Sequence, residues 1–263
     1  MQLHELPSAL TDVDIDVLGF DMCLMAGYET LANIEGAAPF TVFSEETVPG
    51  TGFPYSPILD AFHSDPAMGG RTAAETIADL YHASYEGQED ATTISAYDLA
   101  GFDEFESALD QLAGSLQANL PDLAPAITSA AAGSQPYHFP EMKDLVSFLD
   151  SLEVRVTDEG IQAQIDELRN RALDPEFRLR NHFRNGSGED DRNVSRSSGL
   201  GIVLPSGIGD DAFGQDGSRS LAGYQSQVPG RAWTDFLSDF VSLGGPGTPG
   251  ALPSPAGHKC LSI

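Results

Sequence analysis

The stretch that decides the fold is "DVDIDVLGFDMCLMAGYET", which runs from Asp12 to Thr30. Within it, Ile15 to Phe20 is an apolar, β-branched run bounded by aspartates, and this pattern predicts a buried strand. From Leu24 onward the apolar positions recur at helical spacing, so we expect a helix that ends near Gly36. "PFTVF", from Pro39 to Phe43, predicts a second strand. This strand, helix, strand order predicts a βαβ unit, and hence a parallel sheet with a right-handed crossover.

The remainder of the chain is predicted to be mostly helical. "LGIVLP" (residues 200–205) predicts one further strand, and residues 231–243 predict a last helix. The polar, Gly- and Ser-rich stretch 181–198 is expected to be a long exposed loop. We expect residues 1–243 to form one domain and the Gly- and Pro-rich residues 244–263 to form a disordered tail. Four apolar stripes are predicted to face the core: Ile77, Leu80 and Tyr81; Phe102, Phe105, Leu109, Leu112 and Leu116; Met142, Leu145, Val146, Leu149 and Leu152; Ile161, Ile165, Leu168 and Ala172.

The charge balance excludes several kinds of partner. The chain has 263 residues, with 40 acidic side chains against 13 Lys and Arg, for a formal net charge of -27. Such a protein repels nucleic acid and anionic membranes, so we expect neither as a partner. The acidic residues are spread along the chain and lysine is scarce, which indicates a halophilic protein from a salt-rich environment, where salt screens carboxylate repulsion. We expect no membrane span, and no secretion signal in residues 1–10, because neither pattern is present.

Cys23, one of only two cysteines, lies where the predicted strand ends and the predicted helix begins. Ligands of open α/β sheets bind at the carboxyl ends of strands, and a helix N-terminus stabilises a thiolate. Asp21 would point to the same side as Cys23 if the connection is extended. A carboxylate disfavours a neighbouring thiolate, so Asp21 is better suited to binding a cation than to activating the thiol. The alternative is a buried structural cysteine, with Asp21 capping the helix.

Two segments carry a resemblance to a known family. The first holds Gly19, Phe20, Asp21, Cys23, Leu24 and Met25, followed by Glu29; the second holds Ser44, Glu45, Glu46, Pro49 and Gly50. Both resemble the nucleophile region of the clostripain family, caspase-like cysteine peptidases that cleave after Arg or Lys. The similarity is specific over Gly19 to Tyr55 and continues more weakly, in the same order, to about Leu243.

The resemblance implies an α/β fold, a caspase-like parallel-sheet sandwich flanked by helices and truncated here at its N-terminus. It gives Cys23 the place of the catalytic nucleophile, with its backbone N–H as one half of an oxyanion hole. Asp21 would lie in the pocket for the basic side chain, which it would hold through charge-assisted hydrogen bonds. Ser44 and Glu45 are expected to line the same cleft; the alternatives are a strand-end cap and a solvated carboxylate. Glu46 is expected at the surface, and Glu29 in a structural role.

The implied activity is that of a cysteine endopeptidase acting on peptides or proteins that contain Arg or Lys, without a cofactor. Relatives in the family are mostly exported, which implies an extracellular or cell-surface location. The family's catalytic His lies in a His-Gly motif on an earlier strand, and that motif has no counterpart here. His4 has no following Gly, and His63, His82, His138 and His182 all come after Cys23, so none takes the role by resemblance. We therefore expect the chain to be inactive alone.

Three explanations remain for the missing His: a processed product held to an upstream His-bearing chain, a truncated reading frame, or a degenerate homologue. Truncation is favoured because the sequence starts with Met1. The alternative function is a non-catalytic pseudopeptidase that binds basic peptides. A weaker idea is calcium binding by residues 209–217 or by Glu189 to Asp191, whose oxygens suit Ca²⁺. Neither segment has the spacing of a calcium loop, so we expect no specific metal site.

Overall fold

A mixed sheet forms the centre of the protein. The computed structural model describes residues 3–208 and 221–244. Strands β1 (Val17–Gly19), β2 (Phe40–Phe43), β3 (Thr92–Asp98) and β5 (Arg178–Arg184) follow one another in the order β1-β2-β3-β5. β1 and β2 are parallel, whereas β2 with β3 and β3 with β5 are antiparallel. The predicted βαβ unit is therefore confirmed, but the sheet beyond it is not parallel. A separate ribbon pairs β4 (Met142–Asp144) with β6 (Gly201–Val203).

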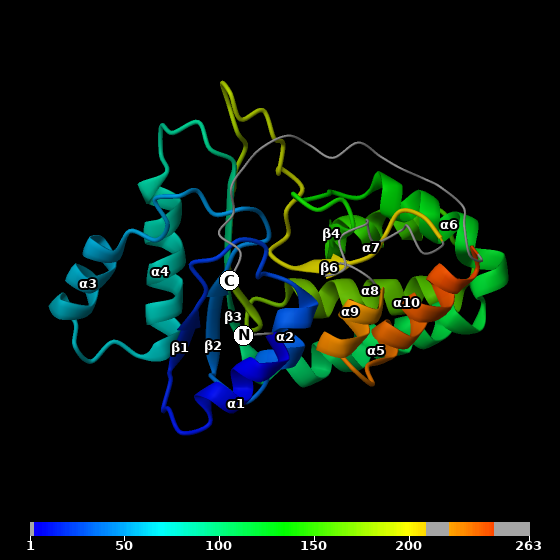
Figure 1. The fold of residues 1–263 in the computed structure, drawn as a ribbon, viewed down its shortest axis with the longest axis horizontal. Helices are drawn as coiled ribbons and strands as arrows, with labels where there is room; N and C mark the ends of the chain where they lie inside the picture. Colours follow the sequence, from blue (N-terminus) through cyan, green and yellow to red (C-terminus); the bar gives the residue numbers. More distant parts are fainter. Residues whose placement is uncertain (1–2, 209–220, 245–263) are drawn as a thin grey trace.

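Helices cover both faces of the sheet (Figure 1). α3 (Tyr55–Ser64) and α4 (Gly70–Ser84) lie on one side. The larger helical layer lies on the other side, beyond the short N-terminal helix α1 (Leu6–Leu10) and α2 (Tyr28–Ile34). It consists of α5 (Phe102–Ala118), α6 (Leu120–Gly133), α7 (Leu145–Glu153), α8 (Glu159–Leu173), α9 (Leu221–Gln227) and α10 (Ala232–Ser242). Within the described residues, no helix is both long enough and apolar enough to cross a membrane.

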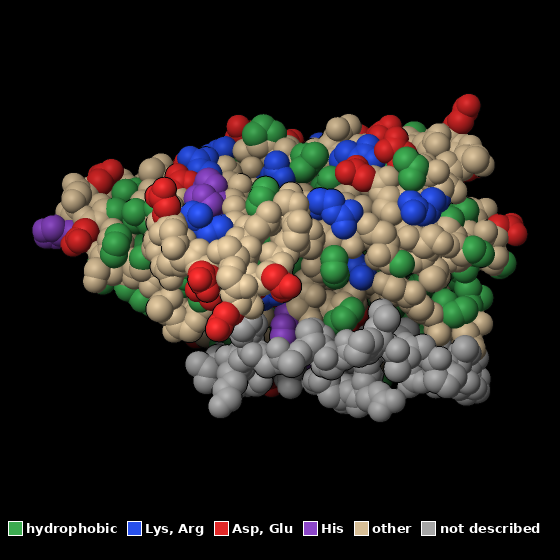
Figure 2. Space-filling view, turned by 90° about the horizontal axis from the view of Figure 1, so that it is seen from above, with side chains coloured by type: hydrophobic (Ala, Val, Ile, Leu, Met, Phe, Trp, Pro, Cys, Tyr) green, Lys and Arg blue, Asp and Glu red, His purple; other side chains and the backbone are tan. Residues whose placement is uncertain are grey.

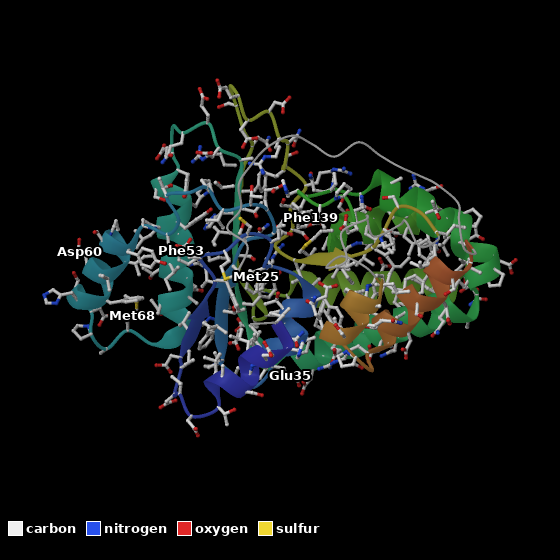
Figure 3. All side chains as sticks on the ribbon, viewed as in Figure 1. Met25, Glu35, Phe53, Asp60, Met68 and Phe139 are labelled. Atoms are coloured by element: carbon white, nitrogen blue, oxygen red, sulfur yellow. The ribbon has the colours of Figure 1, made fainter. Side chains whose placement is uncertain are left out.

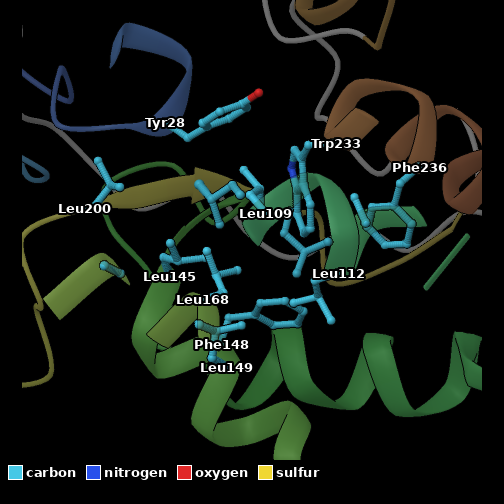
Figure 4. Close-up of a cluster of buried hydrophobic side chains, with 14 of the residues drawn as sticks. Tyr28, Leu109, Leu112, Leu145, Phe148, Leu149, Leu168, Leu200, Trp233 and Phe236 are labelled. Atoms are coloured by element: carbon cyan, nitrogen blue, oxygen red, sulfur yellow. The ribbon is translucent and has the colours of Figure 1, made fainter. Parts of the chain in front are cut away.

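The main hydrophobic core lies between the sheet and the larger helical layer. Trp233 is at its centre, fully buried, and donates its indole N–H to the Val203 carbonyl at 3.0 Å. Phe148 meets the Trp233 ring edge-on, at 6.3 Å between ring centroids (Figure 4). Burial of the apolar faces of these helices supplies the driving force that orders them around the sheet. A smaller core under α4 contains Ile77, Tyr81 and Ile94.

Most of the predicted stripes are confirmed, and the exceptions are instructive. The stripes on α5 and α8 are buried throughout. Met142 belongs to β4 and not to the helix, because α7 begins only at Leu145. The strand β3 was not predicted, and β5 overlaps the start of the expected loop 181–198. That loop expectation is also wrong at Asp190 and Val194, which are buried. Of the predicted tail 244–263, all but Gly244 lies outside the described residues.

Surface charge is interleaved on the face seen in Figure 2, where Lys and Arg lie among Asp and Glu. Arg180 of β5 pairs with Glu75 and Asp79 of α4, and Arg169 pairs with Asp150 and Glu153. Both arginines thus pair with more than one carboxylate, which lowers the local repulsion of an acidic chain.

Candidate active site

The β1–α2 turn (residues 21–27) carries Cys23 and is fastened to the end of β2. The Leu24 N–H donates to the Glu46 carbonyl at 3.2 Å, and the Ala26 N–H donates to the Ser44 carbonyl at 2.9 Å. Leu24 has φ of 61°, the left-handed region that a leucine rarely adopts. Residues held in such a conformation need surrounding contacts to keep them there, and they are concentrated at functional sites.

Cys23 is partly buried in this turn and not on a helix. α2 begins at Tyr28, with Gly27 at its N-cap, so the prediction that a helix N-terminus stabilises the Cys23 thiolate is wrong. The Val48 N–H donates instead to the Cys23 sulfur at 3.4 Å. Cys23 is disulfide-bonded in the structure; the other cysteine, Cys260, lies outside the described residues. A nucleophilic role therefore requires the reduced sulfur.

Asp21 faces the β2–α3 loop (residues 44–54) and the first residue of α3. Its carboxylate accepts the Phe53 N–H at 3.1 Å and the Tyr55 hydroxyl at 2.8 Å. The hydrogen bond to Asp21 raises the pKa of Tyr55, so the hydroxyl stays a donor. Gly52 has φ of 63°, and a Cβ there would lie 2.5 Å from the Asp21 carboxylate. The alternative role for Asp21 as a helix cap is wrong, because α2 has no side-chain cap.

Asp21 and Cys23 thus both contact the same loop. Met22 to Leu24 form a bend and a turn, so the extended connection on which the alternation argument depended is not present. In Figure 3, Phe53 lies on the α3 side of the sheet, whereas Met25 lies near the centre of the molecule. The turn therefore spans from the base of α3 to the larger helical layer, with Cys23 between Asp21 and Met25 in the chain.

Ser44 and Glu45 lie inside the protein, with exposures of 0% and 1%. The Ser44 hydroxyl bonds to Thr93 Oγ1 at 2.9 Å and donates to the Glu46 carbonyl at 2.9 Å. Glu45 accepts the Tyr137 hydroxyl at 2.7 Å. In this conformation neither side chain is open to a bound peptide. Ser44 resembles the strand-end alternative, whereas the alternative of a solvated carboxylate is wrong for Glu45, which is buried.

Glu46 and Glu29 are both buried. The sequence indicated burial for neither residue. Glu46 is 2% exposed and pairs with Arg192 at 2.9 Å, so the expectation of a surface residue is wrong. Glu29 accepts the Val203 N–H at 3.0 Å and the Tyr224 hydroxyl at 2.9 Å, and burial raises its pKa. These bonds join α2 to β6 and α9, in agreement with the expected structural role.

Two pockets flank the segment that contains His138 and Phe139. One, of about 550 Å³, is polar and lined by Glu46, His138 and Arg192. The other, of about 250 Å³, is mainly apolar; its lining includes Leu24, Met25, Phe139 and Met142. The β1–α2 turn therefore borders an apolar pocket directly and reaches the polar one through its bond to Glu46.

None of the described histidines hydrogen-bonds to Cys23. His138 lies on the wall of the polar pocket. His82 and His182 stack on each other at 4.7 Å between α4 and β5, and His182 bonds to Asp79 at 2.7 Å. The base of a catalytic dyad is accordingly not seen among residues 3–208 and 221–244.

The described residues contain no cluster of three or more His, Cys, Asp or Glu side chains suited to a metal ion. Within the Glu189 to Asp191 segment, Asp190 is engaged by Arg192 at 2.6 Å and by the Ala91 N–H at 2.8 Å. The hydrogen bond from Arg192 holds the pKa of the Asp190 carboxyl below its usual range. The other segment considered for calcium, residues 209–217, lies outside the described residues.

Comparison with solved structures identifies the fold. A clostripain from Bacteroides thetaiotaomicron ATCC 29148, in complex with a peptide inhibitor, matches with a TM-score of 0.61 at 15% identity, over 90% of this chain and 94% of that chain. An inactive zymogen C11 protease from Parabacteroides distasonis matches with a TM-score of 0.64 at 18% identity, over 90% of this chain and 62% of that chain. A secreted C11 cysteine protease from Bacteroides thetaiotaomicron, in complex with an irreversible peptide inhibitor, gives 0.58 at 14%, over 90% and 63%.

The chain spans about three fifths of the length of the last two proteins. No curated protein matches significantly. The mixed sheet with helices on both faces is the caspase-like arrangement of these proteases. The sequence model of the clostripain family matches residues 1–170, well over half of the chain. The chain therefore belongs to the clostripain family of cysteine proteases.

Proposed function

We propose that the chain is the nucleophile-bearing part of a cysteine endopeptidase that cleaves after Arg or Lys. The observation that carries the proposal is the β1–α2 turn, which presents Asp21 and Cys23 to one loop while the end of β2 holds it in place. A turn fixed at both flanks keeps a nucleophile and a binding group at constant separation, which is the main requirement for positioning a peptide bond.

The reaction assigned to Cys23 is acyl transfer. The reduced sulfur attacks the carbonyl carbon of the scissile bond, and the C–N bond breaks as the amine leaves with a proton. Water then attacks the thioester carbonyl, releasing the acid product and the Cys23 thiol. The Cys23 backbone N–H is proposed as one donor to the oxygen that becomes negatively charged in both steps.

Asp21 is proposed to select the basic side chain. Its two oxygens accept one protein donor each from Phe53 and Tyr55, and a carboxylate offers about four acceptor sites. The remaining sites suit a guanidinium or ammonium group. Tyr55 is 58% exposed, which leaves this end of the loop open to solvent and to a peptide.

The general base is proposed to come from a His-bearing strand outside residues 1–263. β1 is the edge strand of its sheet and bonds to β2 on one side only, within the described residues. An open edge accepts another strand through main-chain hydrogen bonds. A parallel strand added to β1 would end beside the β1–α2 turn, so a His just beyond it would meet Cys23.

The test is reconstitution. The reduced chain is mixed with the polypeptide encoded upstream, and hydrolysis of Arg, Lys and Leu peptide amides is followed, with Cys23→Ala as the control. Turnover of the Arg and Lys amides, but not of the Leu amides, by the mixture that contains the wild-type chain and not by the mixture that contains Cys23→Ala supports the proposal. Tight binding of an Arg peptide that survives Cys23→Ala, without turnover in any mixture, would instead establish the non-catalytic binding module.

A further inference from the structure

Two carboxyl groups meet in the interior directly behind the β1–α2 turn. Glu45 lies two residues beyond the end of β2 and is 1% exposed, and Asp144 ends β4 and is 0% exposed. The Tyr137 hydroxyl lies 2.7 Å from Glu45 Oε1 and 3.2 Å from Asp144 Oδ2, so it brings the two carboxyl groups together. Two carboxylates in contact and out of water cannot both be ionised without a cation between them.

No Lys, Arg or His among the described residues pairs with either group. The other ionisable side chains that face them are tyrosines, Tyr137 beside both carboxyls and Tyr97 of β3. Arg178 of β5 acts electrostatically on Tyr97, but its guanidinium donates to the Ser198 carbonyl at 2.6 Å. The pair must therefore lower its charge by keeping a proton.

Hydrogen-bond accounting shows which carboxyl is the anion. Asp144 Oδ1 accepts the Ser147 N–H at 2.7 Å, at the start of α7. Asp144 Oδ2 accepts both the N–H of Ser198 at 2.5 Å and its hydroxyl at 2.7 Å. Three strong donors on one carboxyl group favour its ionised form.

Glu45 has the opposite surroundings. Its Oε2 is fully buried and accepts no hydrogen bond from any described donor. A buried oxygen with no donor is costly as an anion, but it becomes satisfied if it carries the proton and donates to Asp144. Burial, and then the charge of Asp144, raise the pKa of Glu45 well above its usual range; the donors oppose the effect of burial on Asp144.

We propose that Glu45 carries a proton at neutral pH and donates it to Asp144, and that this shared proton positions the strand end that holds Cys23. The residues on either side of Glu45 are the ones that fasten the turn: the Ser44 and Glu46 carbonyls accept its N–H groups. Glu45 ties this strand end to β4 and to the Tyr137 and Ser198 segments. It is a positioning residue, and its effect on turnover rests on the proposed function, whereas its protonation does not.

Glu45→Gln separates the two roles. The amide donates an N–H to Asp144 as the acid does, but it cannot titrate. Glu46→Gln is the matched control, because Glu46 is the next residue, equally buried, and paired with a cation, Arg192. Infrared spectroscopy at neutral pH reads the protonation state directly, through the carbonyl band of a protonated carboxylic acid.

We expect this band to lose intensity in Glu45→Gln and to keep it in Glu46→Gln. The folded chain then holds one proton that the unfolded chain releases, so stability falls as pH rises above the ordinary pKa of Glu. Above about pH 5 the unfolding constant of wild type should rise more steeply with pH than that of Glu45→Gln, by up to about tenfold per pH unit while Glu45 stays protonated in the folded chain.

Positioning is tested on the reduced protein by the rate at which iodoacetamide alkylates Cys23, which requires no peptidase activity. Glu45→Gln should keep the wild-type rate, and Glu45→Ala, which loses the link to Asp144, should change it several-fold. An unchanged infrared band in Glu45→Gln, or equal pH slopes, would overturn the shared proton. Equal alkylation rates in wild type and Glu45→Ala would overturn the positioning role. If the infrared, pH and alkylation results are as expected but the reconstituted protein shows no turnover, the proposed function is wrong and the role of Glu45 stands.

Discussion

The ends of β1 and β2 are neighbours in the sheet, yet they are built in opposite ways. β1 is an edge strand that is only partly buried, and it leads into a turn whose Asp21 and Cys23 remain partly exposed. β2 lies between two strands, and Ser44, Glu45 and Glu46 that follow it are all buried. The polar groups behind the turn bond to other buried groups, whereas Asp21 and Cys23 bond to the partly exposed β2–α3 loop. The turn that carries Cys23 is therefore held by hydrogen bonds to the buried residues after β2, and not by a helix of its own.

The largest effect is expected at the exposed end. Cys23→Ala should reduce turnover by the reconstituted enzyme to background, because no other described residue can form the thioester. The free energy of unfolding, measured by urea titration under reducing conditions, should change by less than about 1 kcal/mol, since Cys23 is only partly buried. Residual turnover in this variant would remove Cys23 from the mechanism.

The next effect belongs to the buried end. Thr93 Oγ1 accepts the N–H groups of both Glu45 and Glu46 at 3.0 Å. Thr93→Val leaves the buried Glu45 N–H without an acceptor, whereas the Glu46 N–H keeps the Ser44 hydroxyl at 3.3 Å. Each unsatisfied donor costs about 1–3 kcal/mol, and urea titration should show a loss in that range or above it. Thr92→Val is the control on the same strand, equally buried and without a side-chain hydrogen bond in the described structure. Equal losses in the two variants would contradict the bracing role of Thr93.

A third prediction concerns selection of the substrate. Asp21→Asn removes the charge that faces a basic side chain while keeping the side-chain size, and hydrogen bonds to charged groups contribute about 1.5–3 kcal/mol. kcat/KM for Arg and Lys peptides should fall by about tenfold to about a hundredfold, with little change for Leu peptides. Asp60→Asn removes the same charge from the exposed face of α3 and should leave the ratio unchanged (Figure 3). A loss shared by all peptides would mean that Asp21 only maintains the loop.

The smallest effect is expected from the loop that contacts Asp21. Gly52→Ala places a methyl group against the Asp21 carboxylate and forces a left-handed residue, at a backbone cost of roughly 1–2 kcal/mol. Gly50→Ala is the control, because a Cβ there has no neighbour within 4 Å. Thermal unfolding should distinguish the two variants, and an equal effect on both would show that Gly52 makes no special approach to Asp21.

The sequence predicted the parts of the fold that depend on local periodicity. The strands that became β1, β2 and β6 and the stripes of α5 and α8 follow from regular apolar spacing. β5 could not be recognised in the same way, because its "RLRNHFR" sequence is polar and is stabilised by partners on α4, such as Asp79. The late start of α2 was missed because Leu24 and Met25 have helical spacing but line a pocket instead.

In the site, too, local sequence signals were predictable and contacts between distant segments were not. The sequence indicated that Asp21 and Cys23 lie together, but through an extended connection, whereas a turn at Met22 to Leu24 brings both to the same loop. Glu45 was misjudged because an acidic residue at a strand end usually lies at the surface, and in a chain this acidic it carries no special signal. Its partner Asp144 is far away in the sequence, and only the fold brings the two carboxyl groups together at Tyr137. The two glycines of "PGTG" indicated a turn. They did not indicate that Gly52 lies against Asp21.

The most direct test compares two active-site reagents on the reduced, reconstituted protein. A chloromethyl ketone that carries Lys and one that carries norleucine differ chiefly in the charge that Asp21 would recognise. The account predicts that the Lys reagent modifies Cys23 faster by at least about tenfold, as located by mass spectrometry of the digested protein, and that Asp21→Asn abolishes this preference. Equal rates for the two reagents, or modification at a residue other than Cys23, would contradict it.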